Sequence, residues 1–438
     1  MMESSDSQSG CILIVGASGL IGSAVAARLR ADGHRVRVVV RSEEGRRRVP
    51  ADEHLTIDLR DALRPADWLP HLAGVTAVVN CAGVLQDSPR DSTSAANFRG
   101  PAALFDACAE AGVGRVIHFS ALGVGEGGIT PFSRSKEALE HHLRSTAVNW
   151  VILRPSVVVG RAAYGGSALF RGLATLPVLP RIQGAGRISV VQLEDVVETV
   201  RRLLRSETPS RVTIDLAGPE ALEFEEVVAH YRRWLGWRPA RVIRPMPLLM
   251  AAAYRIGDMA GALGWRPPIR TTAQIEIRRG AAASSDEWTA LTGIEPARLE
   301  DALAREPASV QERWFSRLYF LKPLAIAVFA FFWILTGVVS LGPGYDIGVA
   351  LMREGGAGAL SGPGVIAGGL ADLVIGLALL WRRTARLALF AALAITIFYV
   401  LAGTAILPRL WEEPLGPMMK VWPILALNLI LFAILDER

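Results

Sequence analysis

The sequence has few lysines and few cysteines, and both shortages narrow the class of protein. Lysine occurs only at positions 136, 322 and 420, so the formal net charge of +5 over 438 residues comes almost entirely from arginine. The arginines are scattered rather than interleaved with aromatic residues in a patch, which argues against a nucleic-acid partner. The three cysteines, at 11, 81 and 108, have no paired spacing. We therefore expect free buried thiols in a reducing compartment.

Two other features are missing. Residues 1–9 are polar and contain no apolar run, so we expect a disordered tail rather than a signal peptide. His141 and His142 lie side by side on a predicted helix without further ligands at metal spacing, so we expect no metal site.

Hydrophobic residues are abundant, at 51% of the chain, and the mean hydropathy is +0.32. Beyond Lys322 the chain contains four apolar stretches that are close to the length needed to cross a bilayer. We expect a membrane domain over 311–438, with spans near 324–341, 364–381, 385–407 and 417–435.

Basic residues are concentrated on one side of these spans, at Arg313, Arg317 and Lys322 and in the turn that holds Arg382, Arg383 and Arg386. The tendency of basic loops to stay inside predicts a multi-pass protein of the bacterial inner membrane. Its N-terminal domain and its C-terminus then both face the cytoplasm.

The first half of the chain alternates short apolar runs with helical stretches. Strands are expected at 11–15, 36–40, 77–80, 115–120 and 150–153, and helices between them include 95–111 and 133–145. This alternation predicts an α/β domain over 10–207, a Rossmann-type doubly wound parallel sheet. Residues 208–310 are expected to form a small α-rich substrate lobe and connector.

A glycine-rich turn joins the first expected strand to the first expected helix. Gly16, Gly19 and Gly22 follow the apolar run 11–15. In this context the first glycine allows the tight turn, the second lets the backbone approach a pyrophosphate, and the third lets the helix pack on the strand. The helix N-terminus then offers free N–H groups to the anion, which predicts nucleotide binding.

The end of the second strand bears on the choice of dinucleotide. A protein selective for NAD commonly has an acidic residue there, which binds the ribose 2′-hydroxyl. This chain has Arg41 and Ser42 instead, a cation and a hydroxyl suited to a 2′-phosphate. We therefore expect NADP(H) to be preferred, with NAD(H) possible because Glu43 is close by.

Together these pieces resemble the atypical and extended short-chain dehydrogenase/reductase superfamily over residues 10–300, in a branch similar to the nucleotide-binding accessory subunit of respiratory complex I. The matching residues are Gly16–Gly22, Asp58 and Leu59, Asn80–Gly83, Ser120, Lys136, Arg154 and Pro155 with Gly160, and Val190–Asp195. The membrane part resembles the DoxX-like four-helix proteins in length, span count and hydropathy.

The resemblance implies a set of site residues. It assigns cofactor contacts to Gly16, Ser18, Gly19, Leu20, Ile21, Gly22, Arg41, Ser42, Asp58, Leu59, Cys81, Ala82, Gly83, Lys136, Pro155 and Val158. In the superfamily a serine orients the substrate carbonyl, a tyrosine exchanges the proton, and a lysine four residues later lowers the pKa of the tyrosine and holds the nicotinamide ribose. Ser120 and Lys136 match the first and the last of these.

The tyrosine position is occupied by Phe132, which has no proton to give. Three interpretations follow: a reductase with a substitute acid, for which Tyr164 is the first candidate; hydride transfer to a quinone or activated double bond that needs no tyrosine; or a cofactor that serves as a structural or sensing ligand.

The sequence thus predicts a membrane-anchored NAD(P)(H)-binding oxidoreductase for a lipophilic or quinone-like substrate, in contact with membrane lipid. The alternative is a non-catalytic NADP(H)-binding subunit with partners in a membrane complex. Asp372, near the middle of the second span, is either a proton or quinone site or a hydrogen-bond partner of Asn428.

Overall fold

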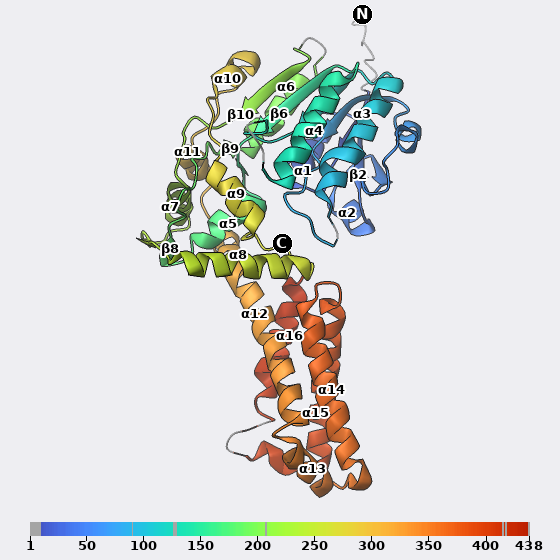
Figure 1. Ribbon diagram of the computed structural model, residues 1–438, viewed down its shortest axis with the longest axis vertical. Helices are drawn as coiled ribbons and strands as arrows, with labels where there is room; N and C mark the ends of the chain where they lie inside the picture. The colour runs from blue at the N-terminus through green and yellow to red at the C-terminus, as the bar shows by residue number, and fades with distance from the viewer. Residues whose placement is uncertain are drawn as a thin grey trace, which may run out of the picture. The chain divides into compact units, whose positions relative to one another are not determined.

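The computed structural model describes residues 10–89, 91–125, 129–205, 208–413, 416 and 418–436. The tail expected at 1–9 lies outside this part of the chain. The chain forms two compact units, which are treated separately below: residues 1–258 with 267–316, and residues 259–266 with 317–438 (Figure 1).

The first unit is built on a parallel sheet of seven strands in the order β10-β6-β5-β4-β1-β2-β3. The strands are β1 (Cys11–Val15), β2 (Val36–Val40), β3 (Glu53–Thr56), β4 (Val75–Asn80), β5 (Arg115–Phe119), β6 (Trp150–Pro155) and β10 (Val212–Leu216). The chain runs outward in one direction from β1 to β3 and in the other from β4 to β10. The carboxyl ends of β1 and β4 therefore border the switch point, where sheets of this kind bind ligands.

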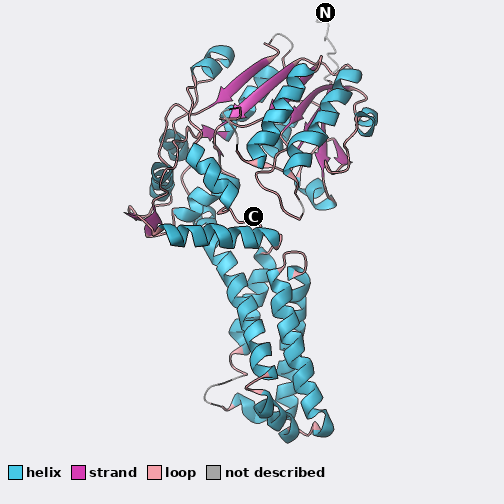
Figure 2. Ribbon diagram, in the orientation of Figure 1, coloured by secondary structure: helices cyan, strands magenta, loops and turns pink. Residues whose placement is uncertain are grey.

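Helices cover both faces of the sheet (Figure 2). One face is packed by α1 (Leu20–Ala31), α6 (Leu193–Leu203) and α10 (Asp286–Thr292), with Val25, Val200 and Trp288 in the core. The other is packed by α3 (Gly100–Glu110) and α4 (Pro131–Ser145), with Phe105 and Leu139 in the core. Buried strands between two helical layers are as expected from their continuous apolar runs, and the predicted fold class is confirmed.

Other elements of this unit include the helices α2 (Glu43–Arg48), α5 (Gly165–Leu173), α7 (Phe224–Trp234), α9 (Thr271–Arg279), α11 (Leu299–Arg305) and most of α8 (Pro247–Ala262). Two pairs of short strands are also present, β7 (Val158–Val159) with β9 (Val191–Gln192), and β8 (Val178–Pro180) with β11 (Arg241–Ile243). The sheet continues past residue 207 into β10, and the residues expected to form a lobe at 208–310 belong to the same compact unit apart from 259–266.

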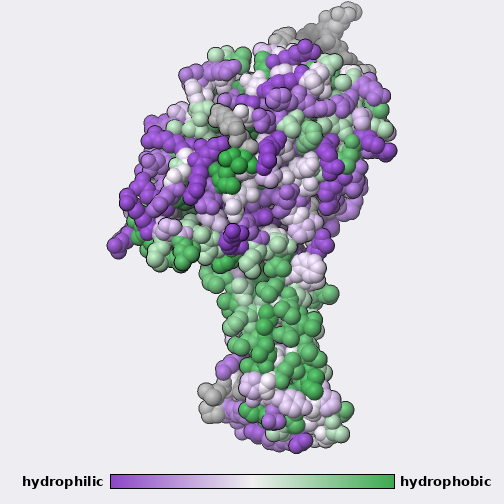
Figure 3. All heavy atoms as spheres, in the orientation of Figure 1, coloured by the Kyte–Doolittle hydropathy of each residue, from purple (hydrophilic) through white to green (hydrophobic). Residues whose placement is uncertain are grey.

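The second unit is helical. It contains α12 (Val310–Leu341, from residue 317 onward), α13 (Tyr345–Glu354), α14 (Ser361–Leu380), α15 (Ala385–Ile406) and α16 (Val421–Ile434). Three of its helices, ending at Leu341, Leu380 and Ile406, are long and apolar enough to cross a membrane, and α16 is apolar but shorter. The surface of these helices is hydrophobic along their middle (Figure 3).

Close backbone contacts hold α12 against α14. A Cβ atom added at Gly337 would lie 2.6 Å from the carbonyl oxygen of Gly369, and one added at Gly376 would lie 2.7 Å from the backbone nitrogen of Ile334. Membrane helices commonly associate through small residues of this kind.

The segment between the first two spans contains the helix α13. The hydroxyl of Tyr399 donates to Asp372 over 3.1 Å, whereas the Asn428 amide donates to the carbonyl of Leu389, so the described partner of Asp372 is Tyr399 rather than the Asn428 of one of the two alternatives. Asp372 lies on α14 and Tyr399 on α15. The apolar sequences of α15 and α16 could not show which of these two helices would supply the hydrogen-bond partner of Asp372.

Candidate functional site

The glycine-rich turn is closed tightly against the end of β4. Gly16 adopts a φ of +75°, and a Cβ atom there would lie 2.7 Å from the backbone nitrogen of Ala82. A Cβ at Gly22 would lie 2.4 Å from the Gly16 carbonyl oxygen, which explains why α1 can start so close to β1. No other residue type fits Gly16 or Gly22 without moving the backbone.

The N-terminus of α1 is open. Its N-cap residue, Gly19, provides no side-chain cap, and the first turn of Leu20, Ile21 and Gly22 carries no acidic residue. Ser18 is exposed in the turn before it. The backbone N–H groups of this turn and the positive end of the helix dipole are thus directed at the switch point, where they suit a pyrophosphate.

Lys136 connects the ends of two neighbouring strands. Its buried ammonium donates to the carbonyl of Ala82, at 3.1 Å, and to that of Phe119, at 2.7 Å. Burial lowers the pKa of Lys136 to about 8, against smaller opposing effects of Cys81 and Glu140. A Cβ at Gly83 would lie 3.3 Å from the Lys136 nitrogen, so Gly83 leaves room for this side chain. Of the three hydrogens on the ammonium, one remains for another acceptor.

Ser120 follows Phe119 at the end of β5. Its side chain is buried, and its hydroxyl has no hydrogen-bond partner among the described residues. On the same strand, His118 is bonded through Nδ1 to the Asn80 amide at 3.1 Å, and its Nε2 is buried without a partner in the described part of the chain. Burial, with Lys136 nearby, lowers the pKa of His118 well below its usual value, so the ring is neutral. A buried hydroxyl without a partner is unfavourable in a folded protein unless a ligand or water satisfies it.

Phe132 is half-buried on the first turn of α4, one helical turn before Lys136. The next residue, Ser133, is buried in a polar cluster with helix α9. Its hydroxyl donates to Glu276 at 2.9 Å and accepts from Arg279 at 2.7 Å. Arg279 also donates to the carbonyl of Leu122, two residues beyond Ser120. Ser133 is therefore engaged in holding α9 over the start of α4.

The residues expected at the adenosine end have partners within the protein. Arg41 forms an ion pair with Asp91 at 2.8 Å, and the Ser42 hydroxyl accepts from the backbone of Gly45 as the N-cap of α2. Asp58 bonds to Arg60, which lowers the pKa of its carboxyl group. Arg41 remains accessible, because 44% of its side chain is exposed.

Four further residues that were expected at the site have no described contact with Ser120 or Lys136. Leu59 is buried in the core beneath α3, Pro155 ends β6 and Val158 starts β7. Tyr164 is the N-cap of α5, where its backbone N–H donates to the Ser167 hydroxyl at 3.0 Å and its carbonyl accepts from that hydroxyl at 2.9 Å. These bonds place Tyr164 at the start of α5, whereas Ser120, Lys136 and the loop Cys81–Gly83 are brought together by direct contacts.

Two residues with a supporting role were not singled out in the sequence. The buried amide of Asn97 exchanges hydrogen bonds with the backbone of Val84, at 2.8 and 2.9 Å, and thereby fixes the loop after β4. Glu140 is buried one turn after Lys136 and pairs with Arg154 and Arg144. No pattern near Glu140 marked it, because the helix around it is mostly polar, and Asn97 was marked only by its place among small and apolar residues.

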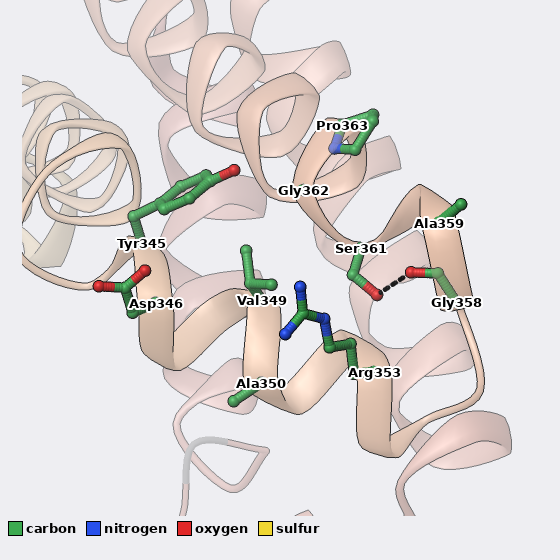
Figure 4. A pocket seen from close by; sticks show the side chains of 10 residues that line it. All are labelled: Tyr345, Asp346, Val349, Ala350, Arg353, Gly358, Ala359, Ser361, Gly362 and Pro363. Atoms are coloured by element: carbon green, nitrogen blue, oxygen red, sulfur yellow. Dashed lines mark hydrogen bonds between the residues drawn. The ribbon is translucent and has the colours of Figure 1, made fainter.

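A separate pocket of about 430 Å³ lies between α13 and the start of α14 in the second unit (Figure 4). Its polar lining comes from Tyr345, Asp346, Arg353 and Ser361, and the Ser361 hydroxyl donates to the Gly358 carbonyl at 2.8 Å. None of the residues expected to bind the cofactor lines it.

Known protein families match both parts of the chain. Residues 16–172 match a family described as NAD(P)H-binding, and residues 330–429 match the DoxX-like family. The chain thus joins an NAD(P)-binding domain with a Rossmann fold, similar to the short-chain dehydrogenases/reductases, to a DoxX-like domain. This agrees with the resemblance drawn from the sequence, while the finer likeness to a complex I accessory subunit stays a prediction.

Individual proteins are more distant. The chain is 25% identical over 282 residues to the ceramide reductase of Caulobacter vibrioides, across 64% of this chain and 86% of the reductase. It is 28% identical over 218 residues to an uncharacterized protein of Mycobacterium tuberculosis, across 50% of this chain and 23% of that protein. The Bordetella bronchiseptica enzyme WbmG, solved with NAD, has a TM-score of 0.54 and 18% identity over 72% of this chain and 97% of its own. At that identity the likeness to WbmG shows the fold.

The geometry fits a nicotinamide dinucleotide. The turn at Gly16 has space only for backbone, the first turn of α1 has free N–H groups, and the ammonium of Lys136 and the hydroxyl of Ser120 both retain hydrogen-bonding capacity. These groups follow β1, β4 and β5 and so extend across the switch point from the phosphate end to the reactive end.

Proposed function

We propose that this protein is a membrane-anchored NAD(P)H-dependent oxidoreductase that reduces a lipophilic carbonyl or quinone-like compound. The observation that carries the proposal is the buried Ser120 hydroxyl, which lacks a described partner and directly follows the carbonyl that binds Lys136. The similarity to a ceramide reductase supports a lipid as the substrate class. The DoxX-like domain supports a membrane location, and we propose the cytoplasmic face of a bacterial inner membrane on the basis of the arginine-rich turn between α14 and α15.

We propose separate roles for these groups in binding the dinucleotide, orienting the substrate and supplying the proton. The turn from Gly16 to Gly22 binds the pyrophosphate, and the third hydrogen of Lys136, which the carbonyls of Ala82 and Phe119 leave over, is available to a ribose hydroxyl and, during the reaction, to the substrate oxygen. The Ser120 hydroxyl donates to the substrate oxygen and orients it. When bound, the dinucleotide supplies the hydride. Because the pKa of Lys136 is about 8, this group can release a proton near neutral pH, which an ordinary lysine does not. We propose that Lys136, rather than Tyr164, replaces the tyrosine as the proton source.

The first test is turnover of the full-length protein in lipid nanodiscs. We expect NADPH oxidation with a long-chain ketone or a lipophilic quinone, and a fall in kcat of at least about tenfold for Ser120→Ala. Ser145→Ala, which removes an exposed hydroxyl at the end of α4, serves as the matched control and should leave kcat unchanged.

Phe132→Tyr should raise kcat with the ketone about tenfold or more if proton supply limits the rate.

Phe132 favours one other function, that of a cofactor-binding subunit that does not turn over and works with partners in a membrane complex. Tight NADPH binding by the wild type, with no oxidation by any acceptor and no gain from Phe132→Tyr, would support that alternative and contradict the reductase.

We also propose that NADP(H) is preferred over NAD(H). The supporting feature is Arg41, which is accessible at the end of β2, although a 2′-phosphate would have to share it with Asp91. Arg41→Ala should weaken NADPH binding about tenfold while changing NADH binding little, since one charge-assisted contact contributes about 1.5–3 kcal/mol. Equal losses for both dinucleotides in a fluorescence titration would show that Arg41 only holds Asp91. Arg47→Ala, on the exposed side of α2, is the control.

A further inference from the structure

Helix α8 carries a stripe of large apolar side chains on its outer face. Leu248, Leu249, Ile256, Met259 and Leu263 are between 41% and 79% exposed. Their spacing of one, seven, three and four residues places them on one side of a helix. Soluble proteins rarely leave such a contiguous apolar face uncovered.

The opposite face of α8 is fixed to the protein, so the stripe cannot turn inward. Tyr254 is buried, and a Cβ atom at Gly257 would lie 1.7 Å from the carbonyl oxygen of Ile269. Asp258 pairs with Arg270 at 3.3 Å. These contacts determine which side of the helix faces outward.

The residues just after α8, which belong to the second unit, contact the turn between α14 and α15. The carbonyl of Leu263 accepts from the backbone of Arg382 at 3.0 Å, and the Trp265 indole donates to the carbonyl of Leu380 at 2.7 Å. The Arg382 guanidinium lies over the Trp265 ring, 5.6 Å from its centroid. This turn is where one apolar span ends and the next begins, so it belongs at the level of the lipid headgroups, where tryptophan and arginine are favoured.

The charge of the helix suits a lipid surface. The helix carries one cation, Arg255, which is exposed beside the stripe, and one anion, Asp258, which is paired with Arg270. Arg241 and Arg244 are exposed just before the helix. A cationic, apolar helix face is favoured at an anionic membrane surface.

We propose that α8 is an interfacial helix whose Leu248–Leu263 stripe inserts among the acyl chains of the bilayer that holds the DoxX-like domain. The occupant of the stripe is thus lipid. The inference rests on the membrane location of the spans and not on catalysis, so it holds for a reductase and for a non-catalytic subunit alike.

The test uses the full-length chain in nanodiscs with single spin labels at Ile256→Cys and Leu249→Cys. Labelling is selective because Cys11 and Cys108 are buried and burial raises the pKa of the Cys81 thiol. Arg47→Cys, exposed on α2, is the aqueous control, and Leu387→Cys, 71% exposed on α15, is the lipid control.

We expect collisions with a water-soluble nickel chelate to be roughly fivefold rarer at positions 249 and 256 than at 47, and collisions with oxygen to approach those at 387. The shielding should appear in discs of phosphatidylcholine with phosphatidylglycerol that contain one copy of the chain and no other protein. Water-like accessibility at 249 and 256 in those discs would overturn the proposal, even if native membranes restored the shielding, because a protein partner would then cover the stripe.

Discussion

Lys136→Met is expected to lower kcat/KM by at least about 100-fold, because the variant loses both the contact to the ribose and the only described ammonium at the ends of β4 and β5. In the wild type the buried ammonium donates to the carbonyls of Ala82 and Phe119. Methionine has a similar length and fills the same space without a charge, so the Rossmann unit should still fold.

The pH profile gives this prediction a second readout. Burial holds the pKa of Lys136 at about 8, so the ammonium is present below pH 8 and is lost above it. Activity should therefore fall as the pH rises through about 8. Lys136→Arg keeps its charge at any such pH, and its residual activity should lack that falling limb. If the activity of Lys136→Arg still fell as the pH rose through about 8, a group other than Lys136 would be responsible for that fall.

The contribution of Lys136 to the free energy of unfolding is expected to rise over the pH range in which the activity falls. The pKa of Lys136 is lower in the folded state than in the unfolded chain, whose lysines titrate near ~10.4. Between these two values the unfolded chain binds the proton that the folded protein lacks, so the contribution of Lys136 to stability rises with pH across that window. Activity that declined above pH 8 together with stability would point to unfolding rather than to titration at the site.

Arg154→Met is expected to destabilise the Rossmann unit by about 3 kcal/mol, since it removes one partner of a buried ion pair. Glu140 is 1% exposed and accepts from Arg154 at 2.9 and 2.6 Å and from Arg144 at 2.9 Å. Without Arg154, the buried carboxylate keeps one of its three bonds and little access to water.

Two variants control for this result. Arg144→Met removes one of the three bonds to Glu140, together with a bond to the Thr213 hydroxyl, from a more exposed arginine and should destabilise by about 1 kcal/mol. The double variant Glu140→Gln with Arg154→Met removes the buried charge and should recover most of the loss. The rate at which the buried thiol of Cys108 becomes reactive in urea reports unfolding of this unit alone, and equal rates for both arginine variants would contradict the prediction.

Local patterns in the sequence were enough for the central strands and the glycine turn. The run 11–15 and Gly16, Gly19 and Gly22 carry their signal within a dozen residues, because strand burial and turn geometry are decided there. Ser120 and Lys136 were instead assigned from the resemblance to the superfamily, and their roles stay predictions, although the structure places Ser120 and the Lys136 ammonium at the ends of adjacent strands.

Long-range pairings were not predictable in this way. Ser133 meets Glu276 across 143 residues, and nothing near Ser133 indicates that α9 will cover it. The extension of the sheet by β10 and the pairing of Asp372 with Tyr399 likewise depend on which distant elements become neighbours, which hydrophobic periodicity does not specify. The position of Phe132 could be read from the sequence, but its chemical consequence depends on the pKa of Lys136, which follows from burial.

Because α12 and α14 meet at glycines, the residues that hold the membrane domain in lipid differ from the residues that hold these two helices together. Retention in lipid depends on side chains directed outward, such as Phe331 and Val374, whereas the fit between the two helices depends on Gly337, Gly369 and Gly376. The outward positions can therefore be exchanged during evolution to match bilayers of different thickness or composition without disturbing the helix pair. Any drift at the three glycines would instead push the helices apart, so these positions should tolerate the least variation in the domain.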